Sequence, residues 1–203
     1  KLGLIGRNGK GKTSQETCKK LSEAMKGKFV GRKMSEETTQ PILEENHRPS
    51  WDEYFMDMMH ALSKRATCNR GKTACLLVKD NHILASGYVG SPPGLPHCDE
   101  VGHLMKKVVN EDGSISEHCV RTIHAEQNAI CQAARRGIAL EGATLYCRMT
   151  PCRTCAMLII NCGIKRVVCE RKYHKGEESE EMFRQAGIEL EFFYDEVQKY
   201  ENQ

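Results

Sequence analysis

The sequence predicts an α/β protein, with a mixed central sheet of about five strands and helices on both faces. Two apolar strands, 74–79 and 82–88, are separated only by the turn pair Asp80-Asn81. Later in the chain, helical and strand segments alternate, which favours stacked layers of helix and strand. The alternating segments, helix first, are 124–136, 143–148, 153–162, 166–170, 178–187 and 188–194.

The chain divides into three predicted parts. Residues 1–30 form an apolar strand, a glycine-rich loop and a helix, and residues 31–49 are a polar linker broken by glycine and proline. Residues 50–203 form the main domain. Its first helix begins after Ser50, a good N-cap, with Glu53 three residues later as in a capping box.

A long segment without a clear pattern, residues 89–118, interrupts the main domain and holds three of the six prolines. Loops of this length in compact domains are usually functional or held in place by something. We therefore expect an irregular loop with a role in a site.

Composition limits the classes of function. The formal net charge of +3 comes from 30 basic and 27 acidic residues, which argues against a dedicated nucleic-acid binder and is compatible with a small anionic ligand. No stretch reaches the roughly 20 apolar residues of a membrane span, and no signal peptide is evident, so we expect a cytoplasmic protein with no membrane partner. The eleven cysteines then indicate metal ligands or small core residues rather than disulfides.

One group of histidine, glutamate and cysteine residues has the spacing of a catalytic metal site. His124-Ala125-Glu126 is followed, after 24 intervening residues, by Pro151-Cys152-Arg153-Thr154-Cys155. Two thiolates three residues apart and an imidazole, each near the start of a helix, supply three zinc ligands and leave a fourth position for water. This pairing is typical of zinc deaminases. The plainer alternatives are a structural zinc site, or a cysteine pair beside an unrelated histidine.

Glu126 need not bind the metal and is free to move protons. Zinc lowers the pKa of its bound water towards about 7, which gives hydroxide at neutral pH. We expect Glu126 to accept the water proton, to deliver it to ring N3 as hydroxide attacks C4, and to protonate the departing amine.

Longer stretches resemble the deoxycytidylate (dCMP) deaminases of the cytidine deaminase superfamily, over about residues 50–195. They include 50–56, 85–88, 121–130, the Pro-Cys segment, 159–165 and Tyr173-His174. The resemblance implies the cytidine-deaminase-like three-layer α/β/α fold, catalytic zinc on His124, Cys152 and Cys155, and Glu126 as the proton shuttle. It also implies hydrolysis of dCMP to dUMP and ammonia, a homo-oligomer (hexamer or smaller), and dCTP and dTTP as effectors.

One residue departs from the family pattern. Val89 stands where relatives have an asparagine that contacts the sugar, and valine cannot hydrogen-bond through its side chain. Three substrates are therefore open: dCMP with a different contact to its sugar, CMP, or a cytosine nucleotide with another number of phosphate groups. The resemblance and the charge of the residues also suggest four candidate substrate contacts: Arg70, Lys72, Ser91 and Tyr173. The alternative for Arg70 and Lys72 is a solvated charge on the surface.

Relatives also carry an additional zinc, and this resemblance implies a second, structural site. The candidate ligands are Cys68, Cys98, His103, His118 and Cys119, with either His118 or Cys119 as the fourth. A closed four-ligand site would hold the long loop in place. The alternative is that the cysteines are buried apolar residues and the histidines lie on the surface.

The N-terminal segment matches the phosphate-binding loop G-x-x-x-x-G-K-T through Gly6, Gly11, Lys12 and Thr13. Only about 35 residues separate it from the helix after Ser50, with no strand ending in aspartate, so ATP hydrolysis by this chain alone is not expected. Three interpretations are open for this segment: part of a larger kinase-like domain that is incompletely represented, a reduced nucleotide-binding remnant with a regulatory role, or a basic glycine-rich arm.

Three other functions compete with dCMP deamination. A deaminase of a base in RNA or DNA is disfavoured by the near-neutral charge and few aromatic residues. A nucleotide-sensing module with purely structural zinc would not need Glu126. A deaminase of a pterin or pyrimidine intermediate differs only in substrate profile.

Overall fold

The computed structural model of the chain describes residues 48–109, 113 and 115–198. The phosphate-loop candidates Gly6, Gly11, Lys12 and Thr13 lie outside the described residues, as does the predicted linker up to residue 47. The predictions for these segments stay predictions.

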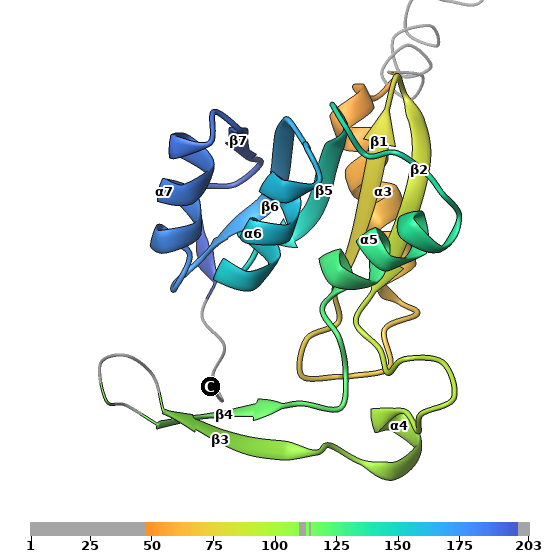
Figure 1. Cartoon of the computed structure of the whole chain (residues 1–203), viewed down its shortest axis with the longest axis vertical. Helices are drawn as coiled ribbons and strands as arrows, with labels where there is room; N and C mark the ends of the chain where they lie inside the picture. Colours follow the sequence, from red (N-terminus) through yellow and green to blue (C-terminus); the bar gives the residue numbers. More distant parts are fainter. Residues whose placement is uncertain (1–47, 110–112, 114, 199–203) are drawn as a thin grey trace, which may run out of the picture. The chain divides into compact units, whose positions relative to one another are not determined.

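A mixed five-stranded sheet, in the order β2–β1–β5–β6–β7, forms the centre of the described domain (Figure 1). β1 is antiparallel to both β2 and β5, whereas β5, β6 and β7 run parallel to one another. A short strand, β8, pairs with the end of β6. The predicted mixed sheet is confirmed. Its strands are β1 (Ala74–Lys79), β2 (His82–Tyr88), β5 (Thr144–Met149), β6 (Arg166–Tyr173), β7 (Glu189–Phe192) and β8 (Val197–Gln198).

Helices cover both faces of the sheet, which gives the three layers expected. α3 (Trp51–Ser63) packs Phe55, Met56 and Met59 against the even-numbered residues of β1. The opposite face carries α5 (Ala125–Arg135), α6 (Arg153–Asn161) and α7 (Glu177–Gln185), which enclose the larger core cluster with Cys75 and Leu77 of β1. β1 is therefore buried on both faces, as a central strand between two helical layers must be. Among the described residues, no helix has the length and apolar character needed to cross a membrane.

The first helix is fixed at its N-terminus. The Ser50 side chain accepts a hydrogen bond from the Glu53 amide, and the Glu53 carboxylate accepts one from the Ser50 amide, so the predicted capping box is present. In the first turn, Asp52 accepts two hydrogen bonds from Arg166 of β6, at 2.8 and 2.7 Å. These bonds lower the pKa of Asp52 and join α3 to the sheet.

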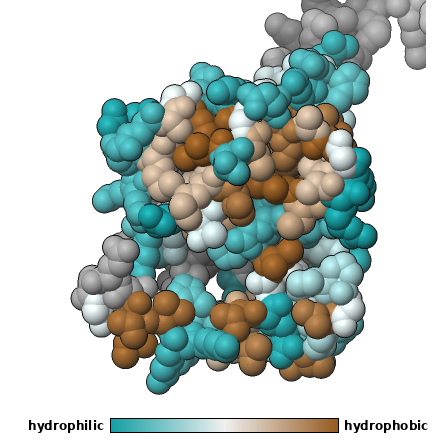
Figure 2. All heavy atoms as spheres, in the orientation of Figure 1, coloured by the Kyte–Doolittle hydropathy of each residue, from teal (hydrophilic) through white to brown (hydrophobic). Residues whose placement is uncertain are grey.

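The segment 89–118 is not irregular, and this expectation was wrong. It contains the short helix α4 (Cys98–Val101) and an antiparallel ribbon of β3 (Met105–Val109) with β4 (Ile115–Cys119), separate from the central sheet (Figure 1). Val109 and Ile115 are about two-thirds exposed, and apolar side chains line the lower edge of the molecule in Figure 2. Because four of the five residues of β3 are exposed, its sequence lacks the alternation that marks a half-buried strand.

β2 and α5 approach each other unusually closely at Gly87. A Cβ atom on this residue would lie 2.3 Å from both the Ala125 carbonyl oxygen and the Ala129 amide nitrogen. Nearby, the Asn128 side chain donates a hydrogen bond to the Tyr88 carbonyl at 2.9 Å, which fixes the helix along the strand. The first turn of α5 is therefore placed by direct backbone contact with β2.

We predict that Gly87→Ala destabilises the domain, because its methyl group must displace α5 backbone rather than a flexible side chain. Overpacking of this kind costs about 1–3 kcal/mol. Urea unfolding followed by circular dichroism measures the loss. Ser86→Ala, one residue earlier on the same strand, is the control, and an equal effect of both substitutions would contradict the close-approach explanation.

Candidate metal centre and substrate pocket

Three predicted ligands meet where α5 and α6 begin. His124 is the N-cap residue of α5, Cys152 is the N-cap residue of α6, and Cys155 lies in the first turn of α6. His124 Nδ1 lies 3.4 Å from Cys152 Sγ and 3.5 Å from Cys155 Sγ. Two motifs distant in sequence are thus brought to one point by the ends of two helices on the same face of the sheet (Figure 1).

The geometry of this group fits zinc. Zinc–sulfur bonds of about 2.3 Å and a zinc–nitrogen bond of about 2.0 Å at tetrahedral angles place the N and S ligand atoms about 3.5 Å apart. The two nitrogen–sulfur distances agree with that value, and all three ligand atoms lie within 4.8 Å of one another. Three protein ligands, rather than four, are the arrangement of a catalytic zinc site that keeps a position for water.

The electrostatics of the group favour a thiolate. The hydrogen bond from Cys155 is the main cause that lowers the pKa of Cys152 to about 4, with a further contribution from His124. The interaction with Cys152 in turn raises the pKa of His124 to about 9. The thiolate is the form of cysteine that binds metal, so the lowered pKa of Cys152 favours binding of a metal cation.

Glu126 lies beside the ligands but is not one of them. Its side chain is buried, with the Cys155 thiol 3.6 Å from Oε2. Burial raises the pKa of this carboxyl group, because a buried carboxylate loses its hydration. A carboxyl group in such surroundings holds a proton more readily than one on the surface, as a general acid and base must.

A pocket opens onto the metal group. Of the predicted substrate contacts, Arg70, Val89 and Tyr173 line it, whereas Lys72 and Ser91 are not among its lining residues. Lys72 is exposed, and its carbonyl accepts a hydrogen bond from Arg148. Sequence analysis missed several lining residues that lie one to three positions from a recognised motif or strand: Thr73, Thr122, Met149 and Thr150.

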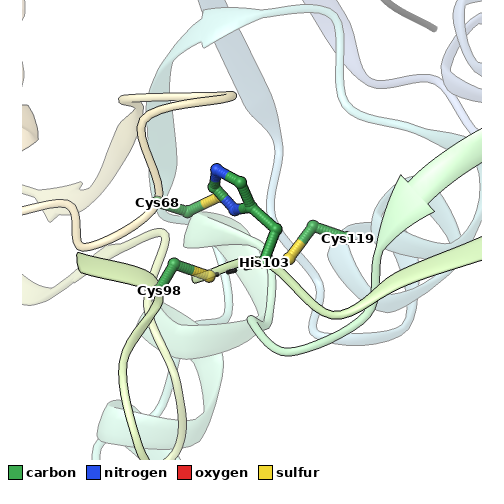
Figure 3. Close-up of side chains that lie close together, drawn as sticks. All are labelled: Cys68, Cys98, His103 and Cys119. Carbon is green, nitrogen blue, oxygen red and sulfur yellow. Dashed lines mark hydrogen bonds between the residues drawn. The ribbon is translucent and has the colours of Figure 1, made fainter. Parts of the chain in front are cut away.

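A second group of ligand atoms gathers beside the pocket. Cys68, Cys98, His103 and Cys119 have their ligand atoms within 4.8 Å of one another, and Figure 3 shows the four side chains converging from separate segments. Cys68 Sγ lies 3.6 Å from His103 Nδ1, and Cys98 Sγ lies 3.6 Å from Cys119 Sγ. The other candidate, His118, is not in this group: its Nε2 lies 2.8 Å from Ser116 Oγ, and the residue lines the pocket.

A Cys₂His group beside a buried carboxylate, at the N-termini of two helices on a mixed sheet, defines a zinc-dependent hydrolytic deaminase. Comparison with known families agrees. The family model described as the cytidine and deoxycytidylate deaminase zinc-binding region matches residues 49–171. The chain belongs to this family.

Relatives at 30–40% identity extend the comparison. ComE operon protein 2 of Bacillus subtilis is 40% identical over 144 residues, which cover 71% of each chain. Deoxycytidylate deaminase of Schizosaccharomyces pombe is 36% identical over 143 residues, which cover 70% of this chain but only 44% of that protein. Among solved structures, the dCMP deaminase of cyanophage S-TIM5 in complex with dCMP and dUMP has a TM-score of 0.58 and 30% identity, covering 72% of this chain and 99% of that one.

We predict that Cys152→Ala lowers the zinc content of purified protein by about one ion per chain, because the remaining two ligands cannot hold the metal at a three-ligand site. Mass spectrometry of metal content checks this directly. Cys131→Ala, which removes an exposed thiol of α5, is the control and should leave zinc unchanged. Equal zinc in wild type and Cys152→Ala would exclude Cys152 as a ligand.

Proposed function

We propose that this chain hydrolyses dCMP to dUMP and ammonia. The observation that carries the proposal is a pocket that ends at the buried carboxyl group of Glu126 and the ligands His124 and Cys152. The names of the S. pombe and cyanophage relatives, and the dCMP and dUMP bound to the latter, support dCMP as the substrate.

The residues of the site have separate roles in this reaction. His124, Cys152 and Cys155 would hold zinc, which supplies a Lewis acid that activates water at neutral pH. Glu126 accepts a proton from the attacking water and delivers it to N3 of the cytosine ring. The Glu126 carboxylate then takes the second proton, from the hydroxyl group now bonded to C4, and delivers it to the departing amine. The C4–N bond breaks, C4 becomes a carbonyl and ammonia leaves. The burial of Glu126 keeps bulk water from competing for these protons.

We further propose that Cys68, Cys98, His103 and Cys119 hold a second, structural zinc. Four ligands of the Cys₃His type form a closed set with no position for substrate, which is typical of structural zinc. The 3.6 Å separations within the group fit the edges of a tetrahedral site. Cys119 lies in the group and His118 does not, so Cys119 is the fourth ligand in this proposal.

Val89 leaves a second cytosine nucleotide as a candidate substrate. Its buried side chain gives the pocket an apolar wall that offers no hydrogen bond to a sugar hydroxyl. A site of this kind discriminates poorly between sugars with and without a hydroxyl group. CMP therefore belongs beside dCMP in any test of activity, together with dCTP and deoxycytidine.

We also propose that the chain works as an oligomer, a hexamer or smaller, that responds to dCTP and dTTP, and that it is cytoplasmic. Two exposed apolar side chains of α6, Met157 and Leu158, support an interface on this helix. Light scattering with and without each nucleotide measures the mass and any change in it.

We predict that Glu126→Gln lowers kcat for dCMP by at least about 100-fold, since a positioned general acid and base contributes about 10²–10⁴-fold. Loss of ultraviolet absorbance from dCMP measures turnover. The amide keeps the size of the side chain but cannot shuttle a proton, so zinc content should be retained.

Glu177→Gln, which changes an exposed carboxylate of α7, is the matched control and should keep wild-type activity. If wild type leaves dCMP, CMP, dCTP and deoxycytidine all unchanged while binding zinc, the proposed function is wrong. If Glu126→Gln remains as active as wild type, Glu126 is not the proton shuttle.

A further inference from the structure

The pairing of β5 with β6 ends beside the pocket, at the partners Met149 and Arg171. The next residue after β5, Thr150, is 4% exposed and lines the pocket. Its Oγ1 accepts a hydrogen bond from the backbone amide of Tyr173, the last residue of β6, at 3.2 Å. A side chain therefore satisfies a backbone donor at the point where the strand pairing stops.

Thr150 also contacts the first turn of α7. Its hydroxyl group donates a hydrogen bond to Glu180 Oε1 at 3.3 Å. Gly176, the N-cap residue of α7, lies so close that a Cβ atom there would be 2.9 Å from Thr150 Cβ and 3.0 Å from Oγ1. The Gly176 amide donates to the carbonyl of Tyr173 at 2.9 Å. Both backbone groups of Tyr173 are thus bonded, one to Thr150 and the other to the start of α7.

Tyr173 is the residue that these bonds fix at the pocket. Among the lining residues within the described part of the chain, it is the only phenylalanine, tyrosine or tryptophan. Burial raises the pKa of its phenol group, and the charge of Cys152 adds to the effect, in keeping with a half-buried ring near the metal ligands. An aromatic ring offers a bound molecule a large and rigid contact surface, provided that its backbone keeps its place.

α7 is anchored by the main core rather than by its surface ion pair. Phe183, on the inward face of the helix, is 1% exposed and belongs to the larger core cluster. Arg153 of α6 pairs with Glu178 in the first turn of α7, but both side chains are more than half exposed, and such pairs contribute little to stability. Burial of Phe183 therefore fixes α7, and the hydrogen bond between Glu180 and Thr150 connects this helix to the pocket.

Resting on the proposed function, we propose that Thr150 and Glu180 are positioning residues, which hold Tyr173 as a wall against the bound nucleotide. The Thr150 hydroxyl group joins α7 to the backbone of Tyr173. The metal group does not depend on this connection, because Cys152 lies at the N-terminus of α6, which has its own buried residues in the core. The Thr150–Glu180 pair thus determines how tightly the substrate binds, while the chemical step depends on Glu126 and the metal ligands.

Steady-state deamination of dCMP, followed by loss of ultraviolet absorbance, tests the role of the hydroxyl group. Thr150→Val should raise KM about tenfold or more and leave kcat within about threefold, because loss of an interaction that serves substrate and transition state alike changes KM. Thr150→Ser keeps the hydroxyl group and should return KM to within about threefold of wild type. Thr144→Val, at the other end of β5, is the matched control and should change neither constant.

Glu180 is tested in the same assay. Glu180→Ala removes the acceptor of the Thr150 hydroxyl group and should raise KM as Thr150→Val does, whereas Glu180→Gln keeps an acceptor oxygen and should resemble wild type. Glu181→Ala is the control, because Glu181 bonds Arg184 and Gln185 of its own helix and is not among the pocket-lining residues. Every variant should keep the zinc content of wild type, by mass spectrometry, and remain folded by circular dichroism.

Hydrogen exchange of the Tyr173 amide, measured by nuclear magnetic resonance, tests the positioning without turnover. This amide donates to Thr150 Oγ1, so its exchange reports whether the bond is kept. Exchange should be faster by about tenfold or more in Thr150→Val and in Glu180→Ala, and unchanged in the two control variants.

The outcomes separate this proposal from the proposed function. If wild type leaves dCMP unchanged, the proposed function is wrong; an unchanged exchange rate in Glu180→Ala overturns the positioning role whether or not dCMP is the substrate. If wild type deaminates dCMP but Thr150→Val and Glu180→Ala keep the wild-type KM, the positioning role is wrong. It is equally wrong if these variants lose zinc and kcat, because the pair would then support the metal group instead of the Tyr173 wall.

Discussion

One imidazole nitrogen and two cysteine sulfurs, carried by two helices, must meet at one point with nitrogen–sulfur distances of about 3.5 Å, and the described domain is arranged around that constraint. Neither helix can form the metal group alone, because α5 begins at His124 whereas the two cysteines lie at the start of α6. The helices are held by the sheet: Gly87 lets α5 approach β2 to backbone contact, and the buried Ala156 and Ile159 seat α6 in the same core cluster. A small displacement of either helix would open the nitrogen–sulfur distances beyond the reach of one ion.

The same helix ends also set the charge of the site. Peptide dipoles place partial positive charge at a helix N-terminus, where it stabilises the thiolate that metal binding needs. Burial acts in the opposite sense on Glu126 and favours its protonated form. A thiolate and a carboxyl group inclined to hold a proton therefore lie side by side. Hydrogen bonds from Cys155 and His124 lower the pKa of Cys152, whereas at Glu126 burial outweighs the opposing effect of His124 and raises the pKa.

The sheet, the four main helices and the Cys₂His group could be predicted from the sequence, because each has a local signal: apolar periodicity, a capping box, or ligands at fixed spacing within one turn. The ribbon could not. Its residues Val108, Val109 and Ile115 are exposed, so no alternation distinguishes core from solvent. The lack of alternation is also why the sequence left open whether His118 or Cys119 joins the group of Cys68, Cys98 and His103. Neighbouring residues of a strand point to opposite faces, and only the register of β4 determines which one meets Cys98.

The two ends of the pocket thus depend on different kinds of stabilisation. The end formed by His124, Glu126 and Cys152 rests on a core of close-packed apolar side chains. In such a core, an added methyl group displaces the helix as a whole. The far end rests on irregular segments and an exposed ribbon, joined to the domain where Cys68 and Cys119 meet. Arg70, Val89 and His118 line this end of the pocket, so a substitution at any of them changes the pocket wall without removing His124, Cys152 or Cys155.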